Sequence, residues 1–212
     1  MLNIKFCGLM RPEDARAAAT CGARYSGVIL TESPRRIDPQ AAALLFEGVP
    51  DSVHRVGVFG NEDPDDIARM AREAGLDLVQ LHGDPTPAQV RRLKVDSGLR
   101  VWAAVRLDRT QLPPLFEELS AVADGIVLDA LVPGMLGGTG RKLDWYALAN
   151  VLQGRRGRAS IVLAGGLTPG NVREAIEAVR PDVVDVSSGV EISPGVKDHE
   201  LMRAFADAAL SA

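Results

Sequence analysis

Cys7 and Asp129 are the two side chains of this sequence best suited to divide base and acid chemistry. Each closes a short apolar run typical of a buried strand, Asn3 to Cys7 and Gly125 to Asp129. A thiol with an unperturbed pKa of about 8.5 needs nearby positive charge or helix dipoles to act as a base near neutral pH. A carboxyl group that acts as an acid must keep its proton, which burial or negative neighbours promote. The alternative for Cys7 is a plain buried residue at a strand end.

Two glycine clusters after the last two apolar runs could hold a phosphate. They consist of Gly165, Gly166, Ser188 and Gly189. Glycine allows an anion to approach bare backbone N–H groups, and loops late in a barrel often bind phosphate in this way. A short helix is expected over Val190 to Val196, with the last long helix beginning near Lys197. The alternative is that the glycines only turn the chain.

Four other polar residues stand behind apolar runs. Arg35 and Arg36 follow the second run, where a guanidinium can bind a carboxylate through two hydrogen bonds. Gln80 and His82 close the fourth run and are candidates for contact with a substrate. The alternatives are a solvated loop for the two arginines and a role in orienting loops for His82.

These candidates are all positioned by short, β-branched apolar runs that alternate with longer amphipathic stretches. The runs are Asn3 to Cys7, Tyr25 to Leu30, Arg55 to Phe59, Leu76 to Leu81, Val101 to Arg106, Gly125 to Asp129, Ile161 to Ala164 and Val183 to Ser187. Such alternation indicates βα units around a parallel sheet. Eight units predict an α/β fold, a single-domain (β/α)₈ TIM barrel over residues 1–212, with the active site at the C-terminal ends of the strands. An open doubly wound sheet is the alternative, but no strand is followed by a dinucleotide fingerprint.

Composition narrows the range of functions. With 46% hydrophobic and 25% charged residues the chain is typical of a globular protein. It has no uncharged apolar run of roughly 18 residues and no leader-like start, so we expect a cytoplasmic protein without a membrane segment. The net charge of -4 argues against nucleic acid as a partner. Two Cys and three His, widely scattered, predict neither a disulfide framework nor a metal site.

Longer motifs share their order and spacing with one known family. The stretches include Lys5-Phe6-Cys7-Gly8-Leu9, Val79-Gln80-Leu81-His82-Gly83, Gly137-Gly138-Thr139-Gly140, Leu163-Ala164-Gly165-Gly166-Leu167 and Asp185-Val186-Ser187-Ser188-Gly189-Val190-Glu191. Together they resemble the phosphoribosylanthranilate isomerase family over nearly the whole chain. The resemblance implies an Amadori rearrangement in tryptophan biosynthesis, in which N-(5-phosphoribosyl)anthranilate becomes 1-(2-carboxyphenylamino)-1-deoxyribulose 5-phosphate without cofactor or metal.

The resemblance also implies residue roles. Asp129 would protonate the furanose ring oxygen, and Cys7 would remove the C2 proton of the opened iminium. Arg35 would hold the anthranilate carboxylate, although Arg36 stands where the family usually has an aromatic residue, so either arginine is a candidate. The phosphate would lie against Gly166, Ser188 and Gly189. The partner is then a small phosphorylated substrate, and the protein is a monomer or a homodimer.

Two other functions are weighed against this one. The first is another phosphate-binding barrel, such as a sugar-phosphate epimerase or a histidine-pathway isomerase. An epimerase would show metal-binding His and acidic residues, and the histidine-pathway enzyme would have Asp where this chain has Cys7. The second is a catalytically silent barrel that binds a metabolite or a partner protein. It predicts the loss of Cys7 or Asp129, and both are present.

Overall fold

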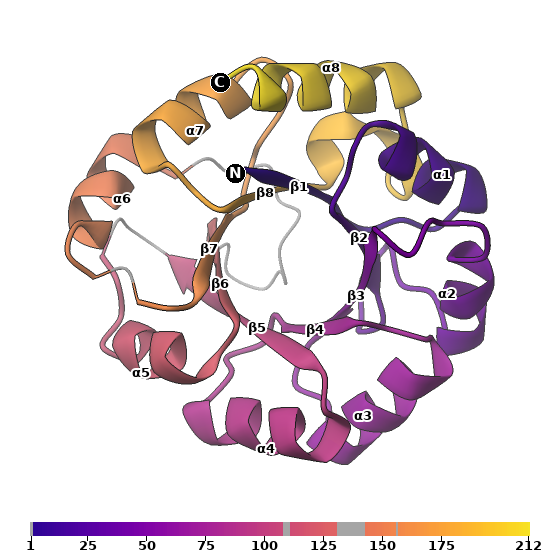
Figure 1. The fold of residues 1–212 in the computed structure, drawn as a ribbon, viewed down its shortest axis with the longest axis horizontal. Helices are drawn as coiled ribbons and strands as arrows, with labels where there is room; N and C mark the ends of the chain where they lie inside the picture. Colours follow the sequence, from indigo (N-terminus) through magenta and orange to yellow (C-terminus); the bar gives the residue numbers. More distant parts are fainter. Residues whose placement is uncertain (1, 108–110, 131–142, 156) are drawn as a thin grey trace.

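Eight parallel strands close into a barrel in the order of the sequence (Figure 1). The computed structural model describes residues 2–107, 111–130, 143–155 and 157–212. The strands are β1 Asn3–Phe6, β2 Tyr25–Ile29, β3 His54–Phe59, β4 Leu78–Leu81, β5 Arg100–Leu107, β6 Gly125–Ala130, β7 Ser160–Leu163 and β8 Val183–Val186. Pairing of β1 with β8, in the register Lys5 to Asp185, closes the ring. The predicted (β/α)₈ TIM barrel is confirmed.

Eight helices among the described residues surround the barrel (Figure 1). They are α1 Pro12–Thr20, α2 Pro39–Leu45, α3 Pro64–Glu73, α4 Pro87–Ser97, α5 Leu115–Val122, α6 Trp145–Leu152, α7 Val172–Val179 and α8 His199–Leu210. The first four begin with proline, whose fixed φ and missing N–H suit a first turn. Side chains such as Asp38, Asp63 and Thr86 cap helix starts by accepting backbone N–H groups. None of the helices in these residues is long and apolar enough to cross a membrane.

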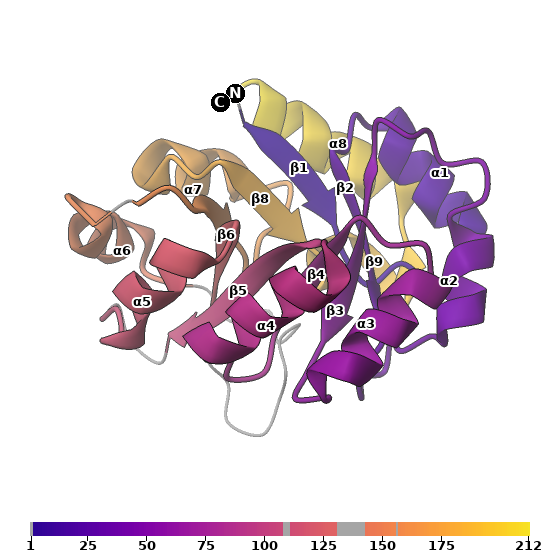
Figure 2. The ribbon, with the colours of Figure 1, turned by 60° about the horizontal axis from the view of Figure 1, so that its bottom comes forward.

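The lower part of the barrel is filled by its own side chains. They form a buried cluster of Val56, Leu78, Trp102, Ala104, Val127, Val162, Ala164 and Val183. Trp102 fits because Gly125 on the next strand has no side chain, and a Cβ there would lie 2.6 Å from the indole ring. In Figure 2 the start of β1 and the end of α8 lie at the same end of the barrel. In this fold ligands bind at the opposite end, where the strands finish.

The structure corrects the segment after β8. The expected helix over Val190 to Val196 is wrong, because only a 3₁₀ turn, η1 Ser188–Val190, forms there. An antiparallel hairpin follows, with β9 Glu191–Ser193 and β10 Val196–Lys197. Pro194 and Gly195 connect its two strands, and the φ of +81° at Gly195 suits a tight turn rather than a helix. The Gly137-Gly138-Thr139-Gly140 stretch that contributes to the family resemblance lies outside the described residues.

Candidate active site

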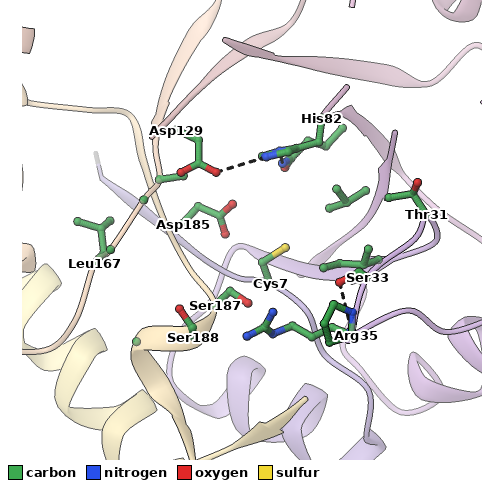
Figure 3. A pocket seen from close by; sticks show the side chains of 18 of the residues that line it. Cys7, Thr31, Ser33, Arg35, His82, Asp129, Leu167, Asp185, Ser187 and Ser188 are labelled. Atoms are coloured by element: carbon green, nitrogen blue, oxygen red, sulfur yellow. Dashed lines mark hydrogen bonds and ion pairs between the residues drawn. The ribbon is translucent and has the colours of Figure 1, made fainter. Parts of the chain in front are cut away.

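A cavity of ≈ 580 Å³ opens where the barrel strands end. This volume suits a small-molecule ligand. Every residue that the sequence singled out as catalytic or substrate-binding, apart from Arg36, lines it, and these residues come from six βα units (Figure 3). They are Cys7, Arg35, Gln80, His82, Asp129, Gly165, Gly166, Ser188 and Gly189. Among the described residues, no three His, Cys, Asp or Glu side chains are grouped to hold a metal ion.

Cys7 lies directly after β1, is only 7% exposed, and points into the cavity (Figure 3). Its backbone N–H donates to the Val186 carbonyl at 2.9 Å, which ties the end of β1 to β8. A Cβ on Gly27 of β2 would lie 3.2 Å from the thiol, so the neighbouring strand leaves room for it. Burial raises the pKa of the Cys7 thiol, and Lys5 only partly opposes this. The expected positive charge is present, but it does not give the net lowering that the sequence suggested, because desolvation dominates.

A buried ion pair that the sequence had not predicted supports the base of the cavity. Lys5 is fully buried, and its Nζ lies 2.7 Å from Asp185 Oδ2 and 3.0 Å from Gln80 Oε1. Burial alone would lower the pKa of Lys5, but Asp185 and Cys7 outweigh it, so the pKa is raised. The sequence did contain a signal for this pair: Lys5 and Asp185 carry opposite charges inside two apolar runs, and buried charges are normally paired. The network brings a stable positive charge close to Cys7.

Asp129 lies near the end of β6 and faces the cavity with 6% exposure. Its Oδ1 accepts the backbone N–H of Ala130 at 2.8 Å, and its Oδ2 lies 3.3 Å from Nε2 of His82. Gly165, two residues after the end of β7, leaves space for this carboxyl group, because a Cβ on Gly165 would lie 2.8 Å from Asp129 Oδ1. The φ of Gly165 is +88°, which L side chains rarely adopt. Gly165 therefore makes room for Asp129, a requirement separate from any contact with phosphate.

We predict that Gly165→Ala lowers the free energy of unfolding by about 1 to 3 kcal/mol, because it adds both backbone strain and a clash with Asp129. Denaturant unfolding measures the change. Gly170→Ala is the matched control in the same loop, since a Cβ on Gly170 meets only Thr168 Oγ1 at 3.9 Å and its φ lies outside the left-handed region. Equal stability of the two variants would contradict the assigned contact.

The loops after β7 and β8 form a cluster of backbone donors. The N–H groups of Gly166, Ser188 and Gly189 have no acceptor within the part of the chain described here. Asn171 holds the first loop, since its Nδ2 donates to the Gly166 carbonyl at 3.0 Å. Gly189 lets the two loops touch, because a Cβ on it would run into the Leu167 carbonyl. Several free N–H groups on one cavity wall are suited to bind an anion such as phosphate.

Arg35 lies across the cavity mouth and is oriented by Glu191. Its Nε and Nη2 donate to the Glu191 carboxylate at 2.9 and 2.7 Å, and Lys197 Nζ donates to the same carboxylate at 2.8 Å. The hydrogen bonds from Arg35 to Glu191 raise the pKa of the Arg35 guanidinium. Gly8 permits the crossing, since a Cβ there would lie 2.6 Å from Arg35 Cδ. Arg36 is exposed and does not line the cavity, so of the two arginines only Arg35 is a cavity residue.

The chain is similar to one family of known proteins over nearly its whole length. Residues 4–208 match the family model of N-(5'-phosphoribosyl)anthranilate (PRA) isomerase. An N-(5'-phosphoribosyl)anthranilate isomerase from Trichlorobacter lovleyi is 44% identical over 208 residues, covering 97% of this chain and 96% of the relative. The crystal structure of phosphoribosyl anthranilate isomerase from Thermotoga maritima superimposes with a TM-score of 0.87 at 35% identity, covering 100% of both chains.

A second crystal structure of phosphoribosyl anthranilate isomerase, in complex with reduced 1-(o-carboxyphenylamino)-1-deoxyribulose 5-phosphate, has a TM-score of 0.84 and is 34% identical, with 100% of both chains covered. The bound compound carries a carboxylate and a phosphate. The match extends over the whole barrel, and the chain belongs to the N-(5'-phosphoribosyl)anthranilate isomerase family.

Proposed function

We propose that the chain catalyses the Amadori rearrangement of N-(5'-phosphoribosyl)anthranilate to 1-(2-carboxyphenylamino)-1-deoxyribulose 5-phosphate, a step of tryptophan biosynthesis. One observation carries the proposal: Cys7 and Asp129 face the same cavity (Figure 3). Arg35 and the cluster of backbone N–H donors line that cavity beside them. The family relationship supports the same reaction. Residues 1–212 act as a single catalytic domain.

The reaction needs one proton delivered and one removed. Asp129 protonates the furanose ring oxygen, the C1–O bond breaks, and the nitrogen lone pair forms an iminium at C1. Cys7, as the thiolate, then takes the proton from C2, and the electrons of the C–H bond neutralise the iminium to give an enolamine. The enolamine tautomerises to the aminoketone product. The positive iminium favours the thiolate form of Cys7, which offsets the effect of burial on the pKa of the thiol.

Binding energy comes from the two anionic ends of the substrate. The phosphate is held by the N–H groups of Gly166, Ser188 and Gly189, and the carboxylate by Arg35. Arg35 keeps its Nη1 and one N–H of Nη2 for the substrate, because Glu191 occupies only Nε and the other side of Nη2. Holding both ends fixes the ribose between Cys7 and Asp129, which converts the two proton transfers into intramolecular steps.

Arg35→Met is expected to raise KM about tenfold or more with little change in kcat, since it removes a charge-assisted contact to the substrate. Glu191 keeps Lys197 as its partner in this variant, so no buried carboxylate is left alone. The matched control is Arg36→Met, which removes the same charge from the exposed neighbour. Steady-state kinetics of both variants decide between the two arginines. A raised KM in Arg36→Met alone would reverse the assignment.

The same family relationship supports proposals about the substrate class, the cofactor requirement, the location and the oligomeric state. The substrate is a small phosphorylated molecule, and the reaction uses no cofactor because each step is a proton transfer or a bond rearrangement. We further propose that the protein acts in the cytoplasm, as a monomer or a homodimer.

The proposed activity is tested by adding purified protein, without metal, to freshly generated phosphoribosylanthranilate. The expected result is rapid loss of the substrate's anthranilate fluorescence, at a rate proportional to the protein concentration. Circular dichroism verifies that the protein is folded. If folded protein leaves the fluorescence decay at its spontaneous rate, the proposed reaction is wrong.

A further inference from the structure

His82 presents a buried donor to Asp129 that the mechanism above leaves unused. The ring is 6% exposed, and its Nε2 lies 3.3 Å from Asp129 Oδ2 (Figure 3). The alignment falls short of a hydrogen bond, so Nε2 has no hydrogen-bond partner among the described residues. Leaving a buried N–H group unpaired is unfavourable. Such a group at the edge of a cavity therefore points to a state of the reaction in which it is used.

Lys5 determines which ring nitrogen of His82 carries the proton. An ammonium group can only donate, so Gln80 must turn its Oε1 toward Lys5, at 3.0 Å. The amide nitrogen of Gln80 then points the other way and donates to Nδ1 of His82, also at 3.0 Å. Because Nδ1 accepts this hydrogen bond, the ring proton resides on Nε2. The N–H group that faces Asp129 is thus fixed by a buried lysine two side chains away.

The carboxyl group of Asp129 is oriented to use this donor. Its Oδ1 accepts the backbone N–H of Ala130 at 2.8 Å, so the proton of the acid form belongs on Oδ2. When that proton leaves, negative charge develops on the oxygen 3.3 Å from His82 Nε2. A donor held this close to a developing charge stabilises it with little reorganisation.

We infer that Lys5 and Gln80 are positioning residues that hold the Nε2–H of His82 toward Asp129, where it stabilises the carboxylate formed when Asp129 gives its proton to the substrate. The stabilisation of the Asp129 carboxylate during the reaction rests on the proposed function. The position of the ring proton on His82 is a property of the protein alone. Gln80 and His82 then act through the acid rather than by contacting the substrate.

Gln80→Glu is the discriminating variant. A carboxylate at this position still accepts from Lys5, but it also accepts from His82, so the ring proton moves to Nδ1. Nitrogen-15 NMR of the histidine rings reports the protonated nitrogen directly, and the chain has only three histidines to assign. Wild type should show the proton on Nε2 and Gln80→Glu on Nδ1, with kcat lower by about 10²-fold and KM within about threefold.

Gln89→Glu is the matched control, since it adds the same charge at the start of α4, outside the cavity. It should leave both the His82 signal and kcat unchanged. The inference is overturned if wild type carries the proton on Nδ1, or if Gln80→Glu moves the proton without lowering kcat. It is also overturned if kcat falls while the proton stays on Nε2. A wild type that shows the expected ring signal but no turnover would instead refute the proposed reaction.

A second pair of variants keeps the inference testable if Gln80→Glu does not fold. His82→Gln retains an N–H donor at about the reach of Nε2, whereas His82→Leu has none. We expect kcat of His82→Gln within about tenfold of wild type and kcat of His82→Leu lower by about 10²-fold, with KM nearly constant in both. Equal loss in the two variants would show that the donor is not the relevant group.

Discussion

Asp129→Asn is expected to lower kcat by at least about 10²-fold and to leave KM close to the wild-type value, because it removes the proposed general acid. The amide keeps the shape of the carboxyl group and an oxygen that can accept from the Ala130 N–H. It cannot supply a proton to the ring oxygen. Substrate binding persists because the proposed anion contacts come from other elements of the barrel.

Steady-state kinetics on phosphoribosylanthranilate give kcat and KM for Asp129→Asn. Asp144→Asn is the matched control, since Asp144 caps α6 by accepting from the Ala147 N–H at 3.0 Å, and asparagine caps equally well. This control should turn over at the wild-type rate. If Asp129→Asn retains near-wild-type kcat, the acid is another group and the proposed mechanism loses its first step.

Cys7→Ser is also expected to lower kcat by about 10²-fold or more, because a hydroxyl gives up its proton far less readily than a thiol and so supplies no base. Serine is smaller than cysteine, so the packing against Gly27 is preserved. Cys21→Ser, at the end of α1 and away from the cavity, is the control for the general effect of losing a thiol. Full turnover by Cys7→Ser would remove Cys7 from the mechanism.

The pH dependence of the wild type provides an independent check on Cys7. Burial raises the pKa of the thiol, so only a small part of it is thiolate near neutral pH in the free enzyme. The thiolate fraction grows with pH, whereas any effect of Asp129 on the rate is shared by wild type and Cys7→Ser. The ratio of kcat/KM between wild type and Cys7→Ser should therefore increase as the pH is raised from neutrality. A ratio that stays constant or falls over this range would exclude the thiolate as the base.

The sequence by itself determined the barrel and the position of the site within it. Local patterns span only a few residues and can be recognised without knowing the fold. They include the apolar strand runs, the prolines at helix starts and the capping side chains. Once eight βα units are recognised, the geometry of a closed parallel barrel puts every strand end on one face. Cys7 and Asp129 could therefore be assigned to one cavity although they are far apart in the chain.

Only the tertiary structure decided what holds those residues in place. Lys5 meets Asp185 across 180 positions of sequence, and Arg35 meets Glu191 across 156. The clearances at Gly165 and Gly189 arise in the same way, from loops brought together by the closed barrel. A local pattern can indicate that a buried charge needs a partner, but it does not say which distant residue is that partner. The tertiary structure also decided the state of Cys7, because the pKa of its thiol depends on how burial balances against Lys5, and burial is a property of the whole fold.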